Sequence, residues 1–83
     1  MEMLYFAWVR ERVGVGQESV DPPEAVRNVA ELIAWLAGRS AGHAEGLRDP
    51  AKLRAAVDQK FVPLDAPLGD AREVAIFPPV TGG

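Results

Sequence analysis

The sequence predicts a single α+β domain, with strand-like segments at both ends of the chain and one main helix between them. Residues 3–9 are rich in aromatic and β-branched side chains, which is typical of a strand. Residues 74–77 form a short apolar run that stops at two prolines, as a buried strand would. Between these segments, apolar residues recur at helical spacing: Val29, Leu32, Ile33 and Leu36.

Length and composition limit the class of protein. The chain has 83 residues, which suits one domain, and 48% of them are hydrophobic, an ordinary fraction for a globular fold. It has no cysteine, which excludes disulfides, thiolate metal sites and cysteine nucleophiles. A net charge of −3 argues against nucleic acid as a partner. No apolar stretch approaches the roughly 20 residues that cross a bilayer, so we expect no membrane contact and a cytoplasmic location.

The first strand is expected over residues 3–9, with apolar side chains on both of its faces. Alternation along a strand separates them into two sets: Met3, Tyr5, Ala7 and Val9, and Leu4, Phe6 and Trp8. Two apolar faces indicate a central strand, or one whose outer face meets a partner. Residues 10–16 then resemble a turn, and residues 17–20 a second strand that pairs back on the first.

The main helix is predicted to begin at Val29. Asn28 and Glu31 have the spacing of a capping box, and Gly38 is a candidate C-cap. We expect this helix to cover one face of a sheet. The following segment, 40–50, is predicted to be a loop or a single helical turn. It contains the only histidine, His43, which we expect in solvent rather than in a site.

Residues 49–62 allow two interpretations. Asp49-Pro50 followed by good helix-forming residues favours a helix on local propensity. The alternative is a strand with Leu53, Ala55 and Val57 facing inward, a turn at 58–60 and another strand at 61–64. Residues 65–70 are turn-like, and Leu68 is expected to enter the core.

The sequence contains no evident catalytic constellation and no metal-ligand spacing. The chemical group that stands out is the terminal carboxylate of Gly83, at the end of a tail without side chains at Gly82 and Gly83. Fully extended, residues 78–83 would reach ~20 Å at ~3.3 Å per residue, enough to enter another protein's active site. A frayed terminus without function is the alternative, and the strand and rigid Pro78-Pro79 before the glycines favour a functional tail.

The chain resembles the small subunits of molybdopterin synthase, which are ubiquitin-like sulfur carriers with the β-grasp fold. Residues 4–14 are similar to the family's first strand and its F-A-x-V-R-E-x-x-G turn, and residues 53–62 to its A-V-N-Q strand and turn, with Asp58 where the family often has asparagine. The end of the chain, F-P-P-V-T-G-G, is the most specific match. The resemblance implies a mixed sheet of about five strands with one main helix on one face. It also implies a β-grasp domain over 1–77, strands rather than a helix in 53–64, and a flexible tail over 78–83.

The same resemblance implies a reaction cycle at Gly83. An adenylating, E1-like activating enzyme uses ATP to adenylate the Gly83 carboxylate, and a sulfur donor protein converts the adenylate to a thiocarboxylate. The tail then enters the active site of the large synthase subunit and gives sulfur to a cyclic pyranopterin monophosphate, forming the dithiolene of the molybdenum cofactor. The chain would bind no cofactor itself and would not be catalytic alone. The expected assembly is two small plus two large subunits, and the tail residues expected in the partner are Pro78, Pro79, Val80, Thr81 and Gly82.

Three phenylalanines, Phe6, Phe61 and Phe77, are expected on the outward face of the sheet together with Leu4, Trp8 and Ala75. One helix covers only one face, so an aromatic cluster on the other face favours a docking surface for the large subunit. The alternative is that some of these rings fill the domain's own core. Three other functions remain open: a sulfur carrier for thiamine or transfer-RNA thiolation, a protein modifier, and an interaction module with an inert tail.

Overall fold

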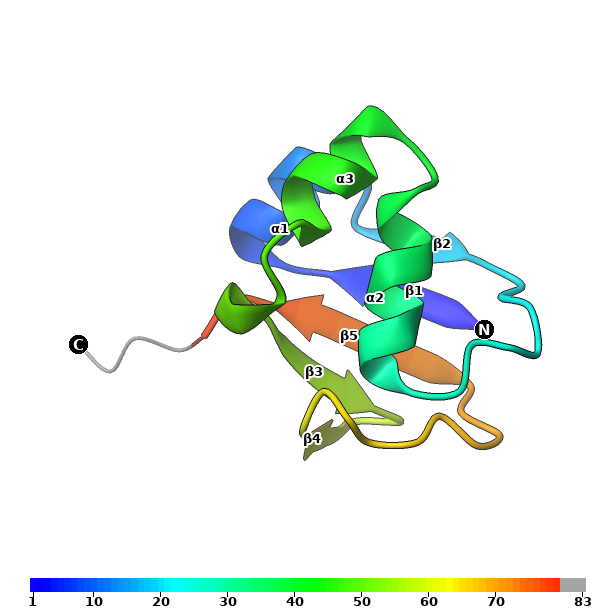
Figure 1. Ribbon diagram of the computed structural model, residues 1–83. Helices are drawn as coiled ribbons and strands as arrows, with labels where there is room; N and C mark the ends of the chain where they lie inside the picture. Colours follow the sequence, from blue (N-terminus) through cyan, green and yellow to red (C-terminus); the bar gives the residue numbers. More distant parts are fainter. Residues whose placement is uncertain (80–83) are drawn as a thin grey trace.

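The computed structural model describes residues 1–79 (Figure 1). The predicted tail positions Val80, Thr81, Gly82 and Gly83 lie outside the described residues. The elements run in the order β1 (Glu2–Tyr5), α1 (Ala7–Val13), β2 (Gln17–Ser19), α2 (Val29–Ala37), α3 (Ala41–Leu47), a 3-10 turn η1 (Pro50–Lys52), β3 (Arg54–Val57), β4 (Lys60–Val62) and β5 (Glu73–Phe77).

The strands form one mixed five-stranded sheet in the order β2-β1-β5-β3-β4. Strand β5 lies at its centre, parallel to β1 and antiparallel to β3. The pairs β1–β2 and β3–β4 are antiparallel, and β2 and β4 are the two edge strands. The predicted sheet of about five strands is therefore confirmed. The division into a domain over 1–77 and a tail from 78 stays a prediction, although β5 does end at Phe77.

The core lies between one face of the sheet and the helices, with α2 crossing the sheet (Figure 1). Alternate residues of β1 and β5 point into it, and so does the apolar stripe of α2. Leu68 is also buried there, as predicted. The fully buried side chains of this core include Met3, Tyr5, Val9, Val29, Leu32, Ile33, Leu36, Leu47, Leu53, Val74 and Ile76.

The prediction for α2 is confirmed down to its cap. The Asn28 side chain accepts a hydrogen bond from the Glu31 N–H at 2.8 Å. The Glu31 carboxylate in turn accepts one from the Arg27 N–H at 2.8 Å, so both residues of the box satisfy free backbone donors at the helix start. Gly38 caps the other end.

The predicted strand over 3–9 and turn over 10–16 are wrong in part, because β1 ends at Tyr5 and α1 follows. Ala7 has a φ of 53°, a left-handed value that turns the chain sharply from strand to helix. Val9 and Val13, four residues apart, are both buried on the inner face of α1, and Gly14 ends the helix at a φ of 100°. Trp8 therefore packs beside the core, with the Arg12 guanidinium 4.5 Å from its ring, and does not lie on the outward face of the sheet.

The prediction of a loop or a single helical turn over 40–50 is also wrong, because residues 41–47 form the seven-residue helix α3, which packs on α1. Its contact face is made of glycines. A Cβ at Gly42 would lie 2.7 Å from the Arg12 carbonyl oxygen, and one at Gly46 3.0 Å from a methyl group of Val13. Helix α3 therefore packs on α1 through close backbone contact, and it lacks the apolar stripe by which an amphipathic helix is predicted from sequence. His43 lies on α3 and is only 8% exposed, so the expectation that it is solvated is wrong too.

In residues 49–62 the strand interpretation is confirmed. The helix-like start at Asp49-Pro50 gives only η1, and strands β3 and β4 follow. Asp58 and Gln59 connect them with φ values of 48° and 70°. One carboxylate oxygen of Asp58 accepts from the backbone N–H of Arg72 at 2.9 Å and of Glu73 at 3.0 Å, which fastens this turn to the start of β5.

Candidate functional site

The candidate site is the face of the sheet that the helices do not cover. Strand pairing places side chains of this face in a row across four strands. Phe61 lies opposite Ala56, Ala56 opposite Ala75, and Ala75 opposite Leu4. These residues alternate with core residues along each strand and so point outward. The predicted placement of Leu4 and Ala75 on this face is confirmed.

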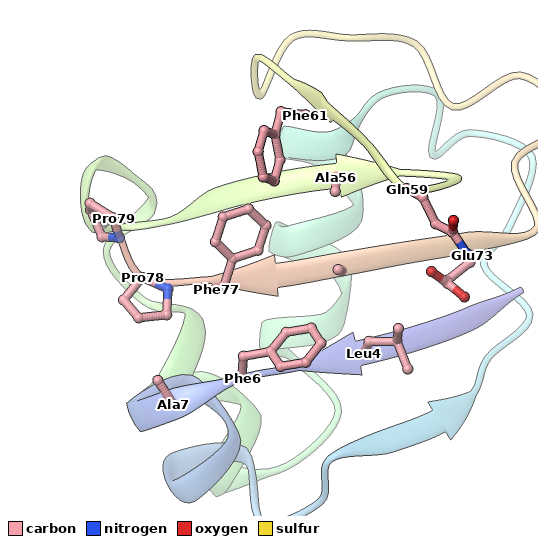
Figure 2. Close-up of a pocket in the computed structure, with 11 residues that line it drawn as sticks. Leu4, Phe6, Ala7, Ala56, Gln59, Phe61, Glu73, Phe77, Pro78 and Pro79 are labelled. Atoms are coloured by element: carbon pink, nitrogen blue, oxygen red, sulfur yellow. The ribbon is translucent and has the colours of Figure 1, made fainter. Parts of the chain in front are cut away.

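All three predicted phenylalanines meet on this face (Figure 2). Phe61 is 84% exposed and Phe6 49% exposed, and Phe77 is half-buried between them. The rings of Phe61 and Phe77 are 5.7 Å apart between centroids and tilted by 53°. Three aromatic rings exposed on one face are unfavourable in water, because their apolar surface stays hydrated unless a partner covers it.

The rings border an open groove of about 720 Å³. Its floor is formed by small side chains, because Ala56 and Ala75 leave space where larger residues would fill the face. Two polar residues, Gln59 and Glu73, stand at one end. The residues that line it are Leu4, Phe6, Ala7, Ala56, Gln59, Phe61, Glu73, Ala75, Phe77, Pro78 and Pro79.

The groove ends where the tail begins. Pro78 and Pro79 follow directly on β5 and line the groove beside Phe77 and Ala7 (Figure 2). Neither proline has a backbone N–H, so β5 cannot extend its pairing past Phe77. The proposed tail therefore leaves the domain at one end of the aromatic face. The remaining predicted tail residues, 80–83, lie outside the described residues.

A polar cluster that no sequence pattern predicted lies on the helix side of the sheet. Glu18 on β2 accepts a hydrogen bond from the Tyr5 hydroxyl at 2.7 Å and contacts Nε2 of His43 at 2.6 Å. The other ring nitrogen of His43, Nδ1, lies 2.7 Å from Oγ of Ser40, which also caps α3 by accepting from the His43 N–H. The cluster thus connects α3 to both β1 and β2.

Two ionisations in this cluster are shifted. Burial raises the pKa of the Tyr5 phenol, and its hydrogen bond to Glu18 adds to the effect, so Tyr5 stays neutral. Burial also pushes the pKa of Glu18 upward, but hydrogen bonds from His43 and Tyr5 outweigh it, and the net effect is a lowered pKa. Although a hydroxyl, an imidazole and a carboxylate lie in series, the aromatic groove does not include them. We therefore assign the cluster to the packing of α3.

Within residues 1–79, no three histidine, aspartate or glutamate side chains are grouped so as to hold a metal ion. Across the same range, none of the helices has the length and apolar character needed to span a membrane.

Comparison with known sequences gives a match over almost the whole chain. A protein-family model described as the ThiS family matches residues 3–83. The chain is 43% identical over 83 residues to the molybdopterin synthase sulfur carrier subunit of Escherichia coli (strain K12), covering all of this chain and 99% of the relative. It is 34% identical over 87 residues to the protein of the same description from Haemophilus influenzae, again with 100% and 99% covered.

Solved structures give the same fold. The crystal structure of SAMP1 from Haloferax volcanii matches with a TM-score of 0.72 at 24% identity, covering 100% of this chain and 98% of that one. A structure described as a putative molybdopterin converting factor, subunit 1, from Pyrococcus furiosus matches with a TM-score of 0.66 at 26% identity over 95% of both chains. The ubiquitin-like β-grasp fold expected from the sequence is thereby confirmed.

Proposed function

This chain belongs to the ThiS family, and we propose that it is the sulfur carrier subunit of a molybdopterin synthase. Both sequence relatives described above carry that name, and their likeness extends over the entire chain. The structural observation that supports the proposal most is the aromatic groove, which ends at Pro78 and Pro79 and so joins a docking surface to the tail.

The proposed chemistry takes place at Gly83. Its carboxylate attacks the α-phosphorus of ATP in an E1-like activating enzyme, and pyrophosphate leaves. The outer sulfur of a cysteine persulfide on a sulfur donor protein then displaces AMP from the acyl adenylate, which gives an acyl disulfide. A second thiol of the donor cleaves the S–S bond of this acyl disulfide, so that Gly83 leaves as a thiocarboxylate and the donor is left with a disulfide. A carboxylate is a poor electrophile and AMP is a good leaving group, which is why the activation step is needed. The thiocarboxylate is a soft sulfur anion, so a chain without cysteine can still carry sulfur.

The proposed acceptor complex forms through the outward face of the sheet. Phe6, Phe61 and Phe77 would be buried against the large subunit of the synthase, as aromatic anchors of interfaces commonly are. Docking there would direct residues 78–83 into the large subunit's active site, where sulfur passes to the cyclic pyranopterin monophosphate. The groups that bind the pterin and move protons would belong to the large subunit. A cytoplasmic location and an assembly of two small plus two large subunits stay predictions.

The test is the intact mass of the purified chain after incubation with ATP, the activating enzyme and a sulfur source. We expect a shift that corresponds to one oxygen replaced by one sulfur, and no shift when Gly83 is deleted. An unchanged mass, with the activating enzyme shown to be competent on another carrier, would contradict the proposal. Conjugates with lysines of other proteins would instead indicate a protein modifier.

A further inference from the structure

The outward face carries a pair of carboxylates at the end away from the tail. Glu2 and Glu73 lie opposite each other on the parallel strands β1 and β5. Both alternate with core residues and so point outward beside the groove, which Glu73 lines. Within residues 1–79, neither carboxylate lies within 4.0 Å of a basic group. Like charges side by side on a sheet are destabilising, so the placement of Glu2 beside Glu73 reduces the stability of the fold.

The surroundings of Glu2 favour its anionic form. The Glu2 carboxylate accepts hydrogen bonds from the Ser19 hydroxyl and from Nε2 of Gln17 at 3.1 Å, and these bonds hold its pKa below the ordinary value. The N-terminal ammonium acts in the same direction, and it also donates to the Val20 carbonyl. Arg72 shares a small pocket with Glu73, but Asp58 lies in that pocket as well, so this end of the face remains negative.

The opposite end of the face carries a cation. Arg54 lies opposite Phe77 at the point where β5 ends and is exposed. One of its guanidinium N–H groups donates to the Leu53 carbonyl at 2.8 Å, and the side chain borders a second hollow with Phe61 and Phe77. Four residues of β5 separate the two ends, about 13 Å at ~3.3 Å per residue. Since the Debye length at physiological salt is ~8 Å, a partner senses the two ends separately.

We propose that the large subunit docking on this face presents a basic side chain to Glu2 and Glu73 and an acidic side chain to Arg54. The apolar groove supplies contact area but no direction, whereas opposite charges at its two ends admit a partner in one orientation only. That orientation keeps the tail end of the face toward the partner's active site. A partner that covered the carboxylate pair without a cation would leave two buried charges unpaired, at a high cost. This inference rests on the proposed function, because it takes the large subunit as the occupant.

The test measures the rate of association with the large subunit at low and at physiological salt. The variants are Glu2→Gln with Glu73→Gln, and Arg54→Gln. The matched controls are Glu45→Gln with Asp49→Asn, and Arg48→Gln, which change the net charge equally on the α3 and η1 side. Thermal unfolding of each variant serves to check that it is folded.

We expect each groove variant to associate roughly threefold to tenfold more slowly than its control at low salt, with a weaker dependence on salt. Rates equal to those of the controls would overturn the inference and leave the proposed function standing, because the wild-type protein would still bind. Failure of the wild-type protein to bind the large subunit would overturn both.

Discussion

Phe61 of β4 and Phe77 of β5 face each other across β3 with their ring centroids 5.7 Å apart, on a face where Phe61 is 84% exposed. The pair therefore adds little to the core and offers a ready aromatic anchor. Because the ring of Phe61 is in solvent, replacing it should leave the fold intact.

Phe61→Asp is expected to weaken binding of the large subunit by at least about tenfold, because a carboxylate would have to be buried where an aromatic anchor was. The dissociation constant measures this, and circular dichroism checks the fold. Val15→Asp is the matched control, since Val15 is 43% exposed and does not line the groove. Equal loss of binding in both variants would contradict a role for Phe61 in docking.

Glu18 should make the fold sensitive to acid. Its lowered pKa means that the folded state favours the carboxylate, so its contribution is complete above the ordinary value of 4.5 and is lost as the pH falls through the folded pKa. Glu18→Gln is expected to reduce the free energy of unfolding at pH 7 by about 1.5–3 kcal/mol, the usual contribution of hydrogen bonds to a charged group. Urea unfolding should show the gap between the two proteins narrowing below pH 4.5. A gap that stays constant into acid would show that Glu18 is not the linked group.

Gly42 should tolerate no larger residue. In Gly42→Ala the new methyl group would lie 2.7 Å from the Arg12 carbonyl and 2.8 Å from that of Val13, so α1 and α3 would have to separate. We expect a loss of about 1–3 kcal/mol in unfolding free energy. Gly38→Ala is the control: its added Cβ meets only the Trp35 carbonyl at 3.6 Å, and a φ of −84° suits alanine. Equal stabilities would mean that the contact between α1 and α3 adapts freely.

Asp58 should accept asparagine but not alanine. Asparagine keeps an oxygen that accepts from the Arg72 and Glu73 N–H groups and tolerates the left-handed φ of 48°. Alanine loses both bonds, so Asp58→Ala is expected to cost about 1–2 kcal/mol and Asp58→Asn much less. Thermal unfolding distinguishes them, and similar losses in the two variants would assign the effect to charge instead.

The sequence was sufficient where local signals agreed with the fold. The capping box at Asn28 and the stripe of α2 were both confirmed, as were β5 and the outward placement of Phe6, Phe61 and Phe77. In residues 49–62, pairing with β5 overrode the helix propensity. The residue pattern left the strand open as an alternative, and the family resemblance decided in its favour.

The sequence failed where packing depends on small residues or on distant partners. Helix α3 has glycines on its contact face, so no apolar period marks it, and the spacing of Gly42 and Gly46 is the signal that could have found it. His43 is buried because Glu18, 25 positions away, meets its ring, and nothing local indicates that contact. Strand β1 ends at Tyr5 because Ala7 has a left-handed φ. Nothing about an alanine predicts that conformation, which is common only for glycine.

We propose that the aromatic face docks the chain so that its tail can deliver sulfur. The decisive experiment mixes thiocarboxylated chain with the large subunit and the cyclic pyranopterin monophosphate, and follows the intact mass of the chain. We expect the wild-type chain to return to the carboxylate mass, while thiocarboxylated Phe61→Asp keeps its sulfur for much longer. Equal rates of sulfur loss from the two proteins, or none from the wild type, would contradict it.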